Sequence, residues 1–153
     1  MFSAVALSLE ERKVTPLHAF VASALAAFRE EGVLNYAIVT SSMQKVGERL
    51  SQIYGRPADP LEALRRATDL LQLAGSVEVE DRDDHYYIKV VTRTCRICPK
   101  AVGGLELSGR LCPLPGLLAG FAGLKPDLEG TRRDGAHCVI AIQKNSGHKG
   151  TEL

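Results

Sequence analysis

Tryptophan is absent from this chain, and aromatic residues make up only 5% of its 153 residues. Neither sign of charge is in excess, because 19 lysines and arginines stand against 18 aspartates and glutamates. The net charge of +1 provides no electrostatic basis for binding nucleic acid or an anionic membrane. A chain of this length with an ordinary apolar content is expected to fold as one domain around one core.

Long apolar runs are also missing, so no membrane span is expected. The apolar residues at the N-terminus meet Glu10 and Glu11 too early for a secretory signal, and no basic segment precedes them. A cytoplasmic location is therefore expected. In that compartment cysteines bind metals or do redox chemistry more often than they form structural disulfides.

The first half of the chain carries three amphipathic helical patterns. The first is expected from Pro16 to Glu31, with Thr15 as N-cap, Gly32 beyond its end and Leu17, Phe20, Val21, Ala24 and Phe28 on one apolar face.

The second helix is expected to be capped by Ser41 or Ser42 and to end near Tyr54. Residues 35–39 before it are either extended or lead into the helix. Its expected inner face consists of Met43, Val46, Leu50 and Ile53. The third helix begins at Asp59-Pro60 and continues until Gly75.

After Gly75 the apolar period changes to two, which predicts a hairpin of residues 76–80 and 85–91 around an acidic turn. A weak strand near residues 128–133 and a last strand at 137–143 complete the expected sheet. We therefore predict a single α+β domain at residues 15–144, with the helices on one face of a small antiparallel sheet. Residues 1–14 form an arm and residues 145–153 a flexible tail.

Four cysteines are the main candidates for chemistry. Cys95 and Cys98 form a C-x2-C pair, Cys112 precedes a glycine-rich apolar helix, and Cys138 lies on the last strand. Four thiolates suit a structural zinc ion, and the start of a helix favours a thiolate. The predicted metal ligands are Cys95, Cys98, Cys112 and Cys138, with Zn²⁺ favoured over an iron–sulfur cluster.

Other interpretations of these cysteines remain open. Three of them could bind a metal together with His137, His85 or a carboxylate, although alternation turns His137 away from Cys138. They could also be buried thiols beside an exposed or redox-active pair. No catalytic residue set stands out, so an enzyme is not favoured.

The segment Cys112-Pro-Leu-Pro-Gly-Leu-Leu-Ala-Gly, read with Asp134-Gly-Ala-His-Cys138, resembles the 4-vinyl reductase domain family over about residues 34–144. The resemblance implies a fold like that of TRAPP vesicle-tethering subunits, a homodimer and a zinc site beside a hydrocarbon pocket. Family zinc ligands correspond to Cys112 and Cys138. The strand before the Asp-Gly turn lacks the family's cysteine, and Cys95 and Cys98 offer a replacement pair.

The expected function is a non-enzymatic zinc domain that binds an apolar small molecule as a sensor or carrier. Its predicted pocket wall consists of Met43, Tyr86, Ile88, Leu114, Leu117, Leu118 and Phe121. The alternative is a winged-helix-like nucleic-acid-binding protein with a structural cysteine site. The helix with Arg65 and Arg66 precedes a hairpin, as in that motif, but its basic surface is small and the hairpin tip is acidic.

Overall fold

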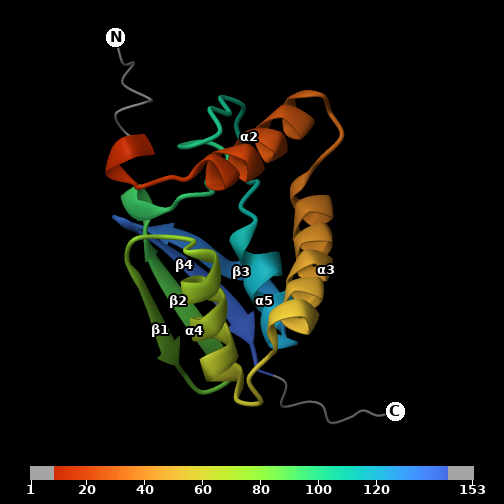
Figure 1. The fold of residues 1–153 in the computed structure, drawn as a ribbon, viewed down its shortest axis with the longest axis vertical. Helices are drawn as coiled ribbons and strands as arrows, with labels where there is room; N and C mark the ends of the chain where they lie inside the picture. Colours follow the sequence, from red (N-terminus) through yellow and green to blue (C-terminus); the bar gives the residue numbers. More distant parts are fainter. Residues whose placement is uncertain (1–8, 145–153) are drawn as a thin grey trace.

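An antiparallel sheet covered by helices on one face forms the frame of the protein, as the computed structural model of residues 9–144 shows (Figure 1). The helices are α2 (Pro16–Glu30), α3 (Tyr36–Tyr54), α4 (Pro60–Leu71) and α5 (Leu114–Ala122). The strands are β1 (Val77–Asp81), β2 (His85–Val91), β3 (Lys125–Asp134) and β4 (His137–Gln143), and a short 3₁₀ helix covers Thr92–Thr94. The predicted α+β class is confirmed.

The four strands pair in the order β1-β2-β4-β3, and all three pairings are antiparallel. Along β2, Tyr86, Ile88 and Val90 are buried, whereas the residues between them are only partly buried. This alternation follows from the two-residue period of a strand and confirms the predicted inner face. β3 is an edge strand, and its register shifts between Asp127 and Arg132.

Helix α5 lies at the centre, where it contacts α3, α4, β3 and β4. Every one of its residues is buried. A Cβ atom at Gly120 would lie 2.0 Å from the Gln44 carbonyl oxygen, and one at Gly116 would lie 2.2 Å from that of Thr40. The glycines of α5 therefore let α3 approach backbone to backbone.

Helix α3 begins earlier than the Ser41 or Ser42 cap predicts. Its N-cap is Asn35, whose side chain accepts a hydrogen bond from the Ile38 N–H at 2.9 Å. Asparagine is a strong N-cap residue, and it makes residues 36–40 the first turn of the helix rather than an extended segment. The caps of α2 and α4 are Thr15 and Asp59, as predicted.

Large apolar side chains on α2 and α3 point outward. The exposed fraction is 77% for Leu17, 69% for Phe20 and 68% for Ile53. The prediction that Val46 and Ile53 line the inner face of α3 is therefore wrong. We use the name outer apolar face for the set of exposed residues Leu17, Phe20, Val21, Phe28, Ile38, Val46 and Ile53.

Small residues take several of the inner positions of the same helices, beside the larger Leu25 and Val39. Ala22 and Ala26 are buried on α2, and Gly47 is buried on α3. Close packing at the small residues leaves no room there for larger side chains.

The expected flexible tail, residues 145–153, lies outside the described residues, as do residues 1–8 of the expected arm. Within residues 9–144, none of the helices combines the length and the apolar character that crossing a bilayer requires.

Candidate functional site

All four cysteines lie in one region of the core. Cys95 is buried, and Cys98, Cys112 and Cys138 pack against the same apolar cluster. Cys95 follows the 3₁₀ helix, Cys112 directly precedes the first turn of α5, and Cys138 pairs with Val90 in the sheet. No disulfide links them, because all four thiols are free in the structure.

Each sulfur has a polar group of the protein beside it. The Ala101 N–H donates to Cys98 Sγ at 3.4 Å. The backbone N–H groups of Ile97 and Leu114 oppose the rise in the pKa of Cys95 and of Cys112. Thr92 Oγ1 lies 3.3 Å from Cys138 Sγ and shares a hydrogen bond with it. Donors aimed at sulfur stabilise the thiolate form over the thiol.

Without a cation, however, Cys95 and Cys112 stay neutral. Burial raises the pKa of Cys95 to about 11, and the thiols of Cys98 and Cys138 raise it further. Burial also raises the pKa of Cys112 far above its ordinary value, and Cys95 is the next largest cause. Negative charges on Cys95 and Cys112 would therefore lack solvation and would repel each other.

The sulfurs do not form a closed coordination shell. Among residues 9–144, no group of three or more histidine, cysteine, aspartate or glutamate side chains has an arrangement that could hold a metal ion. The structure brings the four predicted ligands into one neighbourhood but does not converge them on one point.

The Tyr36 phenol lies close to Cys112, although no local sequence pattern marks it as part of the site. The Tyr36 hydroxyl is buried, and no hydrogen-bond partner for it is found in the described part of the chain. Burial raises the pKa of Tyr36, and the Cys112 thiol raises it further, while the nearby Arg110 opposes the shift. An unpaired buried polar group of this kind is unusual in a folded protein.

Neither alternative histidine ligand is close to the thiols. His137 is exposed at the start of β4. His85 lies at the other end of the β2–β4 ladder, opposite Gln143, whereas Cys138 is opposite Val90.

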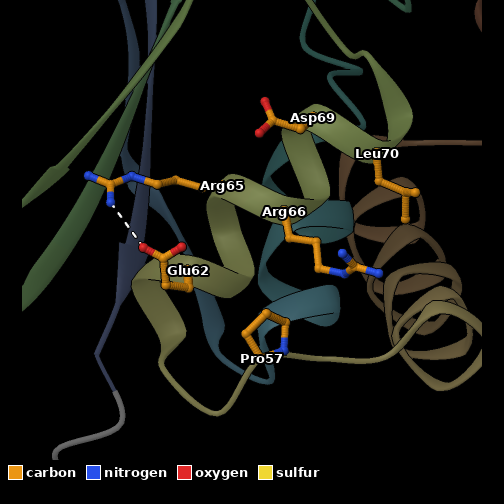
Figure 2. A pocket seen from close by; sticks show the side chains of 6 residues that line it. All are labelled: Pro57, Glu62, Arg65, Arg66, Asp69 and Leu70. Carbon is orange, nitrogen blue, oxygen red and sulfur yellow. Dashed lines mark hydrogen bonds and ion pairs between the residues drawn. The ribbon is translucent and has the colours of Figure 1, made fainter.

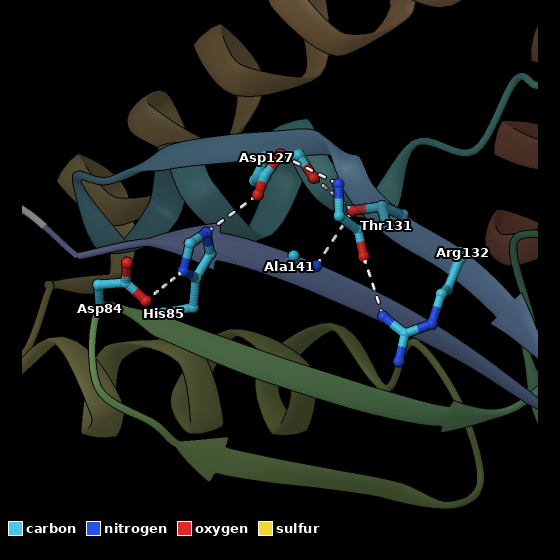
Figure 3. Close-up of polar contacts among 7 residues, drawn as sticks. Asp84, His85, Asp127, Thr131, Arg132 and Ala141 are labelled. Atoms are coloured by element: carbon cyan, nitrogen blue, oxygen red, sulfur yellow. Dashed lines mark hydrogen bonds and ion pairs between the residues drawn. The ribbon is translucent and has the colours of Figure 1, made fainter.

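His85 is instead held between two carboxylates, as Figure 3 shows. Its Nδ1 atom is 2.8 Å from Asp84 Oδ1, and its Nε2 atom is 2.9 Å from Asp127 Oδ2. The Gly130 N–H donates to Asp127 Oδ1 at 3.0 Å, and the Thr131 hydroxyl donates to the Asp127 carbonyl at 2.8 Å. This polar network joins β2 to the irregular part of β3 across β4.

The hydrogen bond from the His85 ring to Asp84 is the largest cause that raises the pKa of His85, and partial burial opposes it. The same contact lowers the pKa of Asp84. Both shifts favour the charged pair. Because His85 and Asp127 are 42 positions apart, no local sequence pattern marks them as partners.

Most of the predicted pocket wall is packed core. Tyr86, Ile88, Leu114, Leu117, Leu118 and Phe121 are all buried in the main apolar cluster, and Met43 packs against it. Met43 and Leu117 also line an apolar groove of about 580 Å³ between α2, α3 and α4. The other lining residues are Thr15, Leu17, His18, Val21, Val46, Leu50, Leu70, Leu71, Gln72, Leu73 and Ile97.

A second hollow, of about 520 Å³, lies beside α4 and carries its arginines (Figure 2). Arg65 pairs with Glu62 at 3.2 Å, and Arg66 donates to the carbonyl oxygens of Tyr54 and Gly55. Asp69 lies on the same surface. These arginines are already engaged by local acceptors, so the hollow is not a strongly basic surface.

Comparison with known proteins corrects the family resemblance. The chain is 32% identical over 72 residues to a protein of Methanocaldococcus jannaschii named Uncharacterized protein MJ0207. The match covers 44% of this chain and 46% of that protein, so the chain spans about half the length of the curated relative it matches.

The profile of the MJ0207 family matches residues 32–144, which is more than half of the chain. The resemblance to the 4-vinyl reductase domain family is therefore wrong. It depended on short glycine motifs, and the structure explains Gly116 and Gly120 by close packing of α5 against α3. The chain belongs to the MJ0207 family.

Proposed function

We propose that this protein is a non-enzymatic metal-binding domain in which Cys95, Cys98, Cys112 and Cys138 hold a structural zinc ion. The observation that carries the proposal is that the four cysteines lie together in one region of the core, where the Ala101 N–H donates to Cys98 Sγ and the Thr92 hydroxyl shares a hydrogen bond with Cys138 Sγ. Hydrogen bonds from the surroundings to metal-bound sulfurs orient the ligands and tune the metal site.

A bound cation would offset the repulsion between closely spaced thiolates in this site. Burial and the neighbouring thiols keep Cys95 and Cys112 protonated. Binding of a divalent ion releases these protons and supplies the positive charge that stabilises closely spaced thiolates. Zn²⁺ accepts four thiolates in structural sites, and an iron–sulfur cluster uses the same ligand set. Cys95 and Cys98 lie outside the regular helices and strands, and so does the loop at residues 99–111 that follows them. In the proposed site, local adjustment of this loop brings the four sulfurs together.

Elemental analysis of protein purified without added metal tests the proposal. We expect one zinc per chain, with the four thiols protected from alkylation until a chelator is added. Cys112→Ser should lose metal and stability together, because binding free energy contributes to folding. Thr131→Ser, a buried hydroxyl variant away from the thiols, is the control and should keep its zinc. Bound iron in place of zinc, or a folded metal-free protein with four reactive thiols, would contradict the proposal.

The apolar groove supports a second candidate function, the binding of an apolar small molecule by a sensor or carrier. Its volume of about 580 Å³ is in the range of small-molecule sites. Its walls carry few polar groups, and the His18 Nε2 atom is already 3.0 Å from the Leu71 carbonyl oxygen. Such a lining favours an uncharged ligand.

An uncharged apolar fluorescent probe, N-phenyl-1-naphthylamine, can measure uptake by this groove. Val46 lines the groove, whereas Gln52 is an exposed residue of the same helix that neither lines it nor belongs to the outer apolar face. We expect Val46→Lys to weaken probe binding at least fivefold and Gln52→Lys to leave it unchanged. No uptake by the unmodified protein, or an equal loss in both variants, would contradict a ligand site in the groove.

The nucleic-acid alternative receives less support. Arg65 and Arg66 have local partners, and the turn between β1 and β2 is rich in aspartate. Binding to DNA or RNA depends on unpaired basic groups near the phosphates. A salt-dependent gel shift at physiological ionic strength would revive this alternative.

A further inference from the structure

We propose that a second copy of this chain packs against the outer apolar face, so that the protein is a homodimer paired through α2 and α3. This inference is independent of the proposed zinc site. It starts from the two helices that present large apolar residues to solvent, while small residues take several of their inner positions.

The outer apolar face has the size that a dimer interface needs. Leu17, Phe20 and Ile53 are each more than two-thirds exposed, and Phe28 is 52% exposed. Summed over the seven residues on the two helices, the exposed area is on the order of 700 Å², close to the ~800 Å² that each partner contributes to a standard interface. Leu17, Val21 and Val46 of this set meet at one groove, and a monomer rarely leaves so much apolar surface uncovered.

The charges on these helices favour a second copy as the occupant. Three basic residues, Arg29, Lys45 and Arg49, accompany three acidic residues, Glu30, Glu31 and Glu48. In a twofold interface the same surface faces itself, so a surface of one sign would repel its copy. A surface with balanced charges can pair with itself, whereas an anionic membrane or a nucleic acid needs excess positive charge.

The proposed interface also covers the apolar groove. Leu17, Val21 and Val46 belong both to the outer apolar face and to the lining of the groove. The two helices that form the face are therefore also two of the walls of the groove. Pairing through this face converts the open groove into a site enclosed between two protomers.

Sedimentation and light scattering of the complete chain test this inference. We expect a dimer at micromolar protein concentration, and we expect Leu17→Glu and Phe28→Glu each to raise its dissociation constant more than tenfold. Ser76→Glu adds the same charge to an exposed position just before β1, outside both helices, and it should leave the dimer unchanged. Ile53→Glu provides an equivalent test from α3, so the inference does not depend on the folding of one variant.

Two outcomes would overturn the proposal. The first is a protein that stays monomeric at every concentration. If that monomer also binds phosphatidylcholine vesicles, the outer apolar face binds lipid instead of a second copy. The second is a dimer whose dissociation constant is the same in Leu17→Glu, Phe28→Glu, Ile53→Glu and the control Ser76→Glu, which would place the interface elsewhere. Circular dichroism of each variant establishes that the fold is retained.

Discussion

The two sides of α3 differ in a way that contradicts the usual relation between hydrophobicity and burial. The inner side carries Gly47, whose missing side chain leaves room for α5: a Cβ atom there would lie 2.3 Å from the Leu117 carbonyl oxygen. The outer side carries Val46 and Ile53, which are 37% and 68% exposed. An apolar stripe on a helix therefore shows where contact is favourable, but not whether that contact is made within the chain.

Substitutions at Val46 and Gly47, two adjacent residues of α3, test this difference between its sides most directly. We expect Gly47→Ala to lower the free energy of unfolding by about 3 kcal/mol or more, because the added methyl group collides with the backbone of α5. Val46→Ala should change it by less than about 0.5 kcal/mol, since alanine is a better helix former and the side chain is exposed. Urea denaturation of both variants measures the difference.

Repeating the urea denaturation at several protein concentrations separates effects on folding of the monomer from effects on dimer formation. At concentrations where the chain is monomeric, Val46→Ala should be nearly neutral. At concentrations where the proposed dimer forms, the same substitution should become destabilising, because pairing stabilises the folded state by mass action. If Gly47→Ala is as mild as Val46→Ala under both conditions, α3 and α5 are not in close contact.

Helix α2 allows the same comparison with a smaller expected effect. Leu25 is 6% exposed and packs with Val39, Leu105 and Leu111, whereas Leu17 is 77% exposed. Leu25→Ala should destabilise the monomer by about 2–3 kcal/mol through the lost burial and the cavity that remains. Leu17→Ala should leave it within about 0.5 kcal/mol. Thermal unfolding of dilute protein can rank the two, and equal losses would mean that Leu17 is buried in the monomer.

The sequence was sufficient for the elements whose signals are local. Thr15-Pro16 and Asp59-Pro60 start their helices as predicted, and the alternation of Tyr86, Ile88 and Val90 identifies the buried side of β2. Such signals depend on neighbouring residues alone, so they survive folding unchanged.

The errors concern features that only tertiary structure decides. The inner side of α3 is set by the glycines of α5, which lie far along the chain from it. The cysteine neighbourhood was foreseeable because C-x2-C and a cysteine before a helix are local patterns. The contact of His85 with Asp127 could not be foreseen, because it depends on the strand order that places β4 between β2 and β3.

The sheet has an inner and an outer side as well, and its outer side carries the charged network of Asp84, His85 and Asp127 besides the buried Val139 and Ala141. Contacts with Asp84 and Asp127 raise the pKa of His85 above its ordinary value of 6.5. A raised pKa in the folded state means that the stabilisation is complete below pH 6.5 and is lost as the pH rises through the folded-state pKa. The pKa of Asp84 is lowered from 3.8, so its contribution is present above that value and is lost as the pH falls below it.

The network should therefore contribute most between about pH 4 and pH 6.5. His85→Gln removes the titrating imidazole, and we expect the smallest effect of these tests from it. Between pH 6 and pH 8.5, the free energy of unfolding should fall less in this variant than in the unmodified protein. His137→Gln removes an exposed histidine and should keep the original pH dependence. Urea denaturation at matched metal content measures both variants. If His85→Gln and His137→Gln have the same pH profile, His85 does not link the strands through its charge.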